Sequence, residues 1–166
     1  MKKLLFVPLI VLSLLLFGCS SGEDTAEKLA SRLEAPFEYS IQSGTYAFNY
    51  KKETSKATVE ITSPEPLSGL LLVRDENGVN ASYDGIMVTL PSRAAKRIFV
   101  LDDIVDSVAL SLKDGTFVRE SRDGSTFFGT SSGLYAYSIE VNEKTGDIVS
   151  AKAENGTEIY EYIFLQ

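Results

Sequence analysis

Turn signals recur at short, even intervals along most of this chain, and they constrain its fold more than any other feature. Seven glycine-containing turn motifs follow residue 76, and the last five, from Gly115 to Gly156, are separated by 9, 9, 13 and 10 residues. Between them apolar and polar residues alternate, which is the period of a half-buried strand. Tight turns at this spacing join antiparallel strands of about five to eight residues. The sequence therefore predicts an antiparallel meander.

The alternation begins at Phe37 and resumes in the opposite phase after Gly44. A phase change at a glycine indicates either a tight hairpin or a bulge in one bent strand. Pro64 and Pro66 end the third strand, because proline cannot donate a ladder hydrogen bond. The predicted strands are 37–42, 46–50, 58–62, 70–74, 79–83, 87–90, 117–121, 126–129, 135–141, 148–153 and 158–164.

Two segments have a helical period instead. The first places Ala26, Leu29, Ala30 and Leu33 on one face, with a cap at Asp24 or Thr25, and Pro36 ends it. The second lies between Pro91 and Gly115, and we expect it to cross one face of the sheet. Its apolar stripe is Ile98, Leu101, Ile104, Val105, Val108 and Leu112. The fold class is α+β: one large curved antiparallel sheet covered by one or two helices, in a single domain over residues 26–166.

The N-terminus is predicted to be a targeting signal and not part of the folded domain. Lys2 and Lys3 precede an apolar run from Leu4 to Phe17, which is shorter than the roughly 20 residues that span a bilayer as a helix. The run ends in Leu16-Phe17-Gly18-Cys19, which resembles the bacterial lipoprotein signal. The resemblance implies a signal peptide at 1–18, acylation of Cys19, a lipidated tether at 19–25 and a place on the extracytoplasmic face of the cell membrane. A plain secretory signal with an incidental cysteine is the alternative.

Composition disfavours several functions. The chain has no histidine and one cysteine, so it offers no imidazole base, no internal disulfide and no thiolate metal cluster. Apart from Lys2 and Lys3, 14 basic and 23 acidic residues remain, a net charge of −9. Nucleic-acid binding needs a basic surface, so it is not expected. We expect no enzymatic activity, no cofactor and no metal site.

Three polar motifs are candidate sites. Ser131 lies in a G-x-S-x-G pattern, which marks a nucleophile only on a strand–turn–helix with a histidine base, so a hairpin turn is the better interpretation. The acidic cluster around Asp102 lacks the alternate spacing and the glycine of a calcium loop, and we expect a solvated helix face. The basic residues before the second helix are a candidate lipid head-group contact, but an ordinary soluble turn is the better interpretation. The two charged sets are Asp102, Asp103 and Asp106, and Arg93, Lys96 and Arg97.

Part of the chain resembles a known group. The segments 61–70 (ITSPEPLSGL), 77–78 (NG) and 82–86 (SYDGI), together with the cysteine-terminated leader, resemble small bacterial lipoproteins of the LolA/LolB-like (outer-membrane lipoprotein carrier-like) group. That group includes germination-related lipoproteins of Gram-positive spore formers. The resemblance covers 37–115 well and the C-terminal meander loosely. It implies an open, curved half-barrel with helices on its concave face, and a cavity that holds acyl chains in the best-known members. Other members act as envelope partners or scaffolds, and the pattern includes no catalytic residue.

Two functions follow as expectations. The first is a lipid-anchored extracytoplasmic binding module that holds a lipid or acylated ligand in an apolar cavity. The second is a cell-envelope scaffold for a protein partner, with a filled core and an unpaired sheet edge. A half-barrel has more inward-facing positions than one helix covers, so apolar side chains are left over for a cavity or for denser packing. The predicted inward-facing ligand contacts are Tyr46, Phe48, Val59, Ile61, Leu70, Leu72, Ile104, Val105 and Val108.

Overall fold

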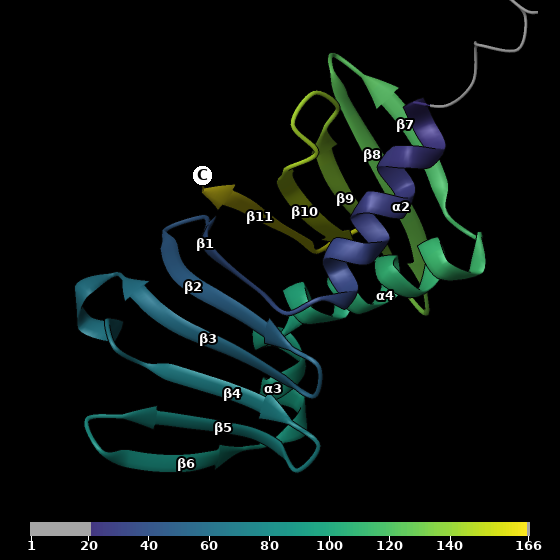
Figure 1. The fold of residues 1–166 in the computed structure, drawn as a ribbon. Helices are drawn as coiled ribbons and strands as arrows, with labels where there is room; N and C mark the ends of the chain where they lie inside the picture. The colour runs from purple at the N-terminus through teal and green to yellow at the C-terminus, as the bar shows by residue number, and fades with distance from the viewer. Residues whose placement is uncertain (1–20, 166) are drawn as a thin grey trace, which may run out of the picture.

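The chain forms an open, curved sheet that is covered in part by helices (Figure 1). The computed structural model describes residues 21–165, without the side chains of 21–24, 92, 93 and 95. In this part of the chain, eleven antiparallel strands form one sheet in the order β6-β5-β4-β3-β2-β1-β11-β10-β9-β8-β7. The edge strands β6 and β7 do not pair with each other, so the sheet is not closed. The predicted α+β half-barrel is confirmed.

The sheet has two arms that meet where β1 pairs with β11, with Ile41 opposite Phe164. One arm consists of β1 (Phe37–Ser43), β2 (Tyr46–Glu53), β3 (Lys56–Ser63), β4 (Leu71–Asp75), β5 (Gly78–Tyr83) and β6 (Ile86–Leu90). The other consists of β7 (Val118–Arg122), β8 (Ser125–Ser132), β9 (Tyr135–Asn142), β10 (Ile148–Glu154) and β11 (Ile159–Leu165). We call them the β1–β6 arm and the β7–β11 arm. Every predicted strand is present.

Local sequence explains how the strands connect. Gly44 has φ +58° in the β1–β2 turn, a conformation that glycine adopts without strain, so the phase change there is a hairpin and not a bulge. After β3, Pro64 leads into a short 3₁₀ turn, η1 (Glu65–Leu67), which returns the chain to β4. The turn packs back on β3 through the Gly69 amide, which donates to the Ile61 carbonyl at 2.9 Å.

Helix α2 (Ser21–Glu34) lies over the β7–β11 arm (Figure 1). Leu29 and Leu33 are buried, as the predicted stripe requires, and Arg32 donates to the Gly146 carbonyl at 2.9 Å in the β9–β10 turn. Residues 21–25 of the predicted tether, 19–25, are helical and belong to α2. The predicted signal peptide and the lipidation of Cys19 lie outside the described residues. In residues 21–165, no helix is long and apolar enough to cross a membrane.

The second helical segment is two helices, α3 (Ser92–Ile98) and α4 (Val100–Asp114), and not one. The break is at Phe99, which leaves the helical region (φ −102°, ψ 30°) and is fully buried. The break lets each helix follow a different part of the curved sheet: α3 contacts β5, and α4 contacts α2, β8, β9 and β10. Gly115 ends α4 in the left-handed region, where its amide donates to the Leu112 carbonyl.

The densest packing is between α4 and the β7–β11 arm. One row of paired residues crosses that arm beneath α4, and each member is buried: Phe128, Ile139, Ala151 and Tyr162. The buried stripe of α4 faces this row: Leu101, Ile104, Val105 and Val108. The concave face of the β1–β6 arm has a shorter cover, since α3, which contacts β5, is seven residues long.

Candidate functional site

An apolar cavity of about 540 Å³ lies against the concave face of the β1–β6 arm. Binding pockets for small molecules have volumes of roughly 300–1,000 Å³ and mostly apolar walls. The cavity fits that description, because its lining contains one charged side chain, Arg97. The lining residues are Ser43, Tyr46, Phe48, Val59, Ile61, Leu67, Leu70, Leu72, Ala81, Leu90, Arg97, Ile98 and Tyr160.

The walls of the cavity follow from strand alternation and register. Phe48 of β2 pairs with Ile61 of β3, so their side chains share one face. A second row runs from Val59 through Leu72 to Ala81, across β3, β4 and β5. These residues are apolar at every second position, as the sequence pattern predicted. They face a space that α3 closes at one end through Ile98.

Six of the nine predicted ligand contacts line this cavity: Tyr46, Phe48, Val59, Ile61, Leu70 and Leu72. The other three, Ile104, Val105 and Val108, are fully buried in the core between α4 and the β7–β11 arm, and they do not line it. Their placement differs from the prediction because the helical segment breaks at Phe99, so α3 and not α4 adjoins the cavity. Seven lining residues were not among the predicted contacts, and three of them, Leu67, Leu90 and Tyr160, reach the cavity from η1, β6 and β11.

A second, smaller hollow of about 330 Å³ adjoins the cavity, since Arg97 and Tyr160 line both. Arg97 is in the last turn of α3, and its guanidinium lies 3.5 Å from the carboxylate of Glu158. The rings of Tyr135 and Tyr137 stack at 6.0 Å between centroids with an interplanar angle of 10°. Lys96 and Arg97 are exposed, as the favoured prediction of a soluble segment requires, but they belong to a helix and not to a turn. Both line the smaller hollow, and Arg97 also lines the cavity.

The acidic cluster of α4 is only in part the solvated face that the sequence predicted, because Asp106 is exposed and Asp102 is buried. Asp102 is 3% exposed and accepts hydrogen bonds from the Tyr50 hydroxyl at 2.8 Å and from the Lys52 ammonium. The Arg74 guanidinium lies 3.3 Å from Asp102 and 2.7 Å from Asp103. These groups, which we call the Asp102 clamp, bind the start of α4 to β2 and β4. A helix-period pattern could not show this, because the basic partners come from two other strands.

Burial and paired charges shift the pKa values in the clamp. Burial, together with the nearby Asp102 carboxylate, holds the pKa of Tyr50 far above its usual value. For Lys52, burial lowers the pKa, but the hydrogen bonds to Asp102 and Asp106 outweigh it and raise the pKa above its ordinary value. The clamp is thus a neutral phenol and a charged ammonium that share one buried carboxylate. It ties the start of α4 to β2 and β4, and none of its residues lines the cavity.

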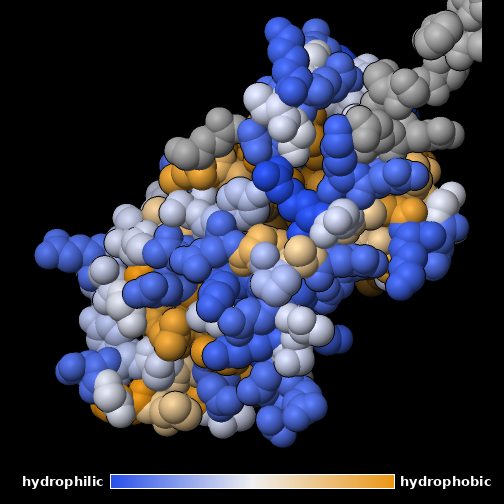
Figure 2. Space-filling view, in the orientation of Figure 1, coloured by the Kyte–Doolittle hydropathy of each residue, from blue (hydrophilic) through white to orange (hydrophobic). Residues whose placement is uncertain are grey.

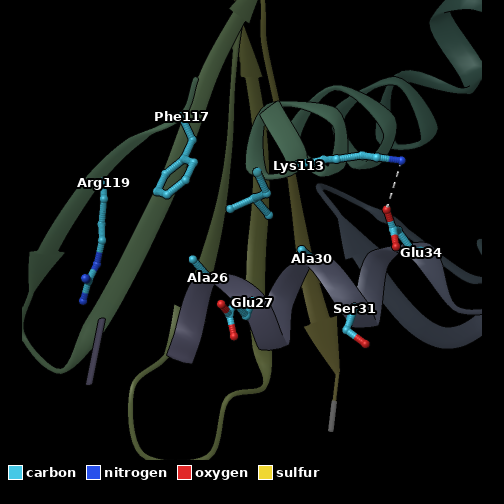
Figure 3. Close-up of a pocket in the computed structure, with 9 residues that line it drawn as sticks. Ala26, Glu27, Ala30, Ser31, Glu34, Lys113, Phe117 and Arg119 are labelled. Atoms are coloured by element: carbon cyan, nitrogen blue, oxygen red, sulfur yellow. Dashed lines mark ion pairs between the residues drawn. The ribbon is translucent and has the colours of Figure 1, made fainter. Parts of the chain in front are cut away.

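A third hollow, of about 700 Å³, lies between α2, the end of α4 and the start of β7 (Figure 3). Figure 3 shows that charged side chains come to it from three elements, and Lys113 of α4 lies 3.9 Å from Glu34 of α2. Its other lining residues include Glu27 and Arg119. This mixed, charged lining makes it a weaker candidate for an apolar ligand than the cavity of the β1–β6 arm.

The G-x-S-x-G motif lies in the β8–β9 hairpin. Ser131 is an exposed residue of β8, paired with Ala136 in a hairpin, and not part of a strand–turn–helix. Within residues 21–165, no three acidic or cysteine side chains come together as metal ligands. The hairpin interpretation of the G-x-S-x-G pattern is confirmed.

Comparisons with known proteins give likenesses of structure only. No family model and no curated protein matches the sequence. An uncharacterized conserved protein from Thermus thermophilus has a TM-score of 0.49 at 10% identity, over 88% of this chain and 85% of that chain. A chain from the complex of the CwlD amidase with the GerS lipoprotein of Clostridioides difficile has a TM-score of 0.48 at 16% identity, over 83% and 88% of the chains. The lipoprotein LppX of Mycobacterium tuberculosis has a TM-score of 0.46 at 8% identity, over 87% and 92%. Lipoprotein structures are thus among the neighbours of this half-barrel.

Proposed function

We propose that this protein is a lipid-anchored, extracytoplasmic binding module that holds a lipid or an acylated ligand in the cavity of the β1–β6 arm. The observation that carries the proposal is the cavity itself: about 540 Å³, with apolar side chains from five strands and a single charged residue in its lining. Burial of an acyl chain there is favourable by about 25 cal/mol for each Å² of apolar surface removed from water. The module would act by binding alone, without a catalytic step.

The leader sequence supports the location. Lys2 and Lys3, the apolar run from Leu4 to Phe17 and Cys19 after it resemble a lipoprotein signal. Acyl chains on Cys19 would keep the module at the membrane, since each buried methylene contributes about 0.8 kcal/mol. The cavity would then lie close to a source of lipid.

Native mass spectrometry of the anchor-free chain, residues 20–166, tests the proposal. We expect an adduct with the mass of a lipid, which organic extraction releases. The variant Ala81→Phe places a ring in the cavity and should lose the adduct. Met87→Phe is the matched control, because Met87 is an exposed residue on the opposite face of the neighbouring strand β6. Spectra of the wild-type chain at its bare mass alone would refute the proposal.

One observation favours a second candidate, a protein-interaction module. Edge strand β6 has the sequence Ile-Met-Val-Thr-Leu without a charge, and Ile86 and Met87 are 69% and 72% exposed. On the face seen in Figure 2, apolar residues reach the surface along the bottom of the molecule, where β6 lies in Figure 1. Uncharged, exposed edges accept additional strands. The partner would be an extended, uncharged strand of an envelope protein that pairs with β6.

Site-specific photocrosslinking tests this candidate. A photoreactive residue at position 89, on the outer face of β6, should capture one partner in cells through an extended segment. The substitution Met87→Lys should abolish that adduct. Persistence of the adduct in the lysine variant, or crosslinks to unrelated proteins only, would refute strand addition at β6.

A further inference from the structure

The smaller hollow adjoins the cavity and lies between α3, the start of α4, the β8–β9 turn and the starts of β9 and β11. Arg97 and Tyr160 line both spaces, so they form the border between them. The smaller hollow is different in chemistry, because it contains two cations, three phenols and a carboxylate. Its lining is Lys96, Arg97, Val100, Asp103, Ser132, Gly133, Leu134, Tyr135, Tyr137 and Tyr160.

The two cations of this hollow have few competing partners. Arg97 is 69% exposed and its contact with Glu158 is 3.5 Å, a long, solvent-exposed pair of the kind that contributes little stability. Among the described residues, no ion pair engages Lys96, which is exposed. The carboxylate of Asp103 is held by Arg74 at 2.7 Å. An anion in the hollow would therefore meet cations that are free to turn toward it.

The tyrosines provide a rigid wall for the same space. Tyr135 stacks on Tyr137 and lies 6.4 Å from Tyr160 between ring centroids. The Tyr135 hydroxyl donates to Glu158 at 2.9 Å, which fixes the ring and satisfies part of that carboxylate. Glu158 also accepts a hydrogen bond from the Asn155 amide at 3.3 Å. Because Glu158 keeps these two donors, it can release Arg97 without being left unpaired.

We propose that this hollow is a head-group site, and that the ligand is an anionic amphiphile: its acyl chain lies in the cavity and its carboxylate or phosphate binds Arg97 and Lys96. The inference rests on the proposed lipid-binding function and names the class of ligand. Charge complementarity selects the anion, since Arg97 is the one charged group that lines both spaces. The net charge of −9 after the leader repels anions elsewhere on the molecule, so a local pair of cations is needed to accept one.

Photolabelling of the full, membrane-anchored chain in phosphatidylcholine vesicles tests the inference. The probes are a photoreactive fatty acid, its uncharged alcohol, photoreactive phosphatidylglycerol and photoreactive diacylglycerol, each with the reactive group on the acyl chain. Labelled peptides are mapped by mass spectrometry at a pH where the acid is ionised. We expect labelling of β2–β4 by the acid, or by phosphatidylglycerol, about three- to tenfold above its uncharged analogue. The pair of probes that shows the preference, fatty acid against alcohol or phosphatidylglycerol against diacylglycerol, identifies the head group as carboxylate or phosphate.

Variants of Arg97 distinguish an effect of its charge on binding from an effect on the fold. Arg97→Gln should remove the preference for the anionic probe and leave labelling by the uncharged probe unchanged, and Arg97→Lys should restore most of it. Lys113→Gln is the matched control: Lys113 is also in the last turn of a helix, is 70% exposed, and has one weak partner, Glu34, at 3.9 Å. It should not alter the preference.

The outcomes distinguish the inference from the function on which it rests. If no probe labels the cavity, the lipid-binding function itself is wrong. If charged and uncharged probes label the cavity equally, or if Arg97→Gln leaves the preference intact, lipid binding stands and the head-group site is refuted. A preference that Lys113→Gln reduces as much as Arg97→Gln would also refute it, because that result assigns the effect to overall charge.

Discussion

The two arms of the sheet are built from the same alternating pattern, yet one is packed solid and the other is hollow. In the β7–β11 arm the row Phe128, Ile139 and Ala151 is completely buried. In the β1–β6 arm the corresponding row, Val59, Leu72 and Ala81, is also little exposed, but it faces the cavity instead of a helix. Residue type does not distinguish the two rows, since both are apolar at every second position. The two rows differ in the helices that pack on them.

The difference in cover follows from dimensions. A helix is about 10–12 Å across and neighbouring strands are about 4.8 Å apart, so one helix covers two or three strands. Helix α4, with 15 residues, lies on β8, β9 and β10, and α2 packs against it. Helix α3 has seven residues and contacts β5. The concave face between β2 and β6 is therefore left without a lid, and a cavity forms there.

The Asp102 clamp links the two regions. It joins the first turn of α4 to Lys52 of β2 and Arg74 of β4, which belong to the hollow arm. Apolar packing places the rest of α4 over the β7–β11 arm. The clamp therefore ties the first turn of the helix to the hollow arm.

The largest effect should come from truncation of matched isoleucines in the two arms. Ile139→Ala removes a fully buried side chain between Phe128 and Ala151, and we expect a loss of about 3–4 kcal/mol in the free energy of unfolding. Ile61→Ala removes a side chain that already borders the cavity, so fewer contacts are lost and we expect about 1–2 kcal/mol. Urea unfolding of the anchor-free chain measures both. Equal losses would show that the hollow arm is as tightly packed as the other.

The second effect concerns the clamp. Asp102→Asn leaves Lys52 and Arg74 partly buried beside a neutral amide, and we expect a loss of about 2–4 kcal/mol. Asp106→Asn is the matched control, since Asp106 is 58% exposed and its contact is with Lys52 alone, so we expect less than about 1 kcal/mol. If the two variants are equally stable, the clamp does not tie the helix to the hollow arm.

The clamp should also make stability fall at alkaline pH. The pKa of Tyr50 is raised in the folded state, so the unfolded phenol ionises first, and stability declines as the pH rises above about 10. The pKa of Lys52 is raised as well, so its contribution is complete below about pH 10.5 and is lost as the pH rises through the folded value. Both shifts act in the same direction. Asp102→Asn should flatten this decline in unfolding experiments at alkaline pH, and an unchanged profile would contradict the assignment.

The third prediction concerns substitutions that enlarge a side chain in each arm. Ala151→Phe forces a ring between Ile139 and Tyr162 in a fully buried row, and overpacking should cost about 1–3 kcal/mol. Ala81→Phe puts the same ring into the cavity, where there is room, and should change the stability by less than about 0.5 kcal/mol. Thermal unfolding of both variants checks this. A large loss in Ala81→Phe would mean that the cavity is not available to a ligand.

Sequence alone predicted every strand, the α+β class and six of the cavity residues. It succeeded because strand alternation and glycine turns are local signals: Phe48 and Ile61 face inward because of the alternation in their own strands. The prediction that the sheet is an open half-barrel came from the resemblance to the LolA/LolB-like group, because local patterns do not specify whether a sheet closes. The open edge between β6 and β7 depends on pairings across the whole chain.

Three features could not be predicted from local sequence. The break at Phe99 has no proline or glycine to mark it, since it arises from the fit of two helices to a curved sheet. Burial of Asp102 depends on Lys52 and Arg74, which are 50 and 28 residues away along the chain. Tyr160 reaches the cavity because β11 pairs with β1, a long-range contact. Each of these is a tertiary effect that overrides the local pattern.

The smallest effect on stability should come from the two edges of the sheet, which differ in charge. Met87 of β6 and Val118 of β7 are 72% and 71% exposed, so a lysine at either position should change the free energy of unfolding by less than about 0.5 kcal/mol. Their effects on association should differ. Strand β7 already carries Arg119, Glu120 and Arg122, whereas β6 has no charge that would oppose pairing with another strand. Met87→Lys should therefore reduce association at high protein concentration in light-scattering measurements, while Val118→Lys leaves it unchanged. Equal behaviour of the two variants would show that the uncharged edge does not drive association.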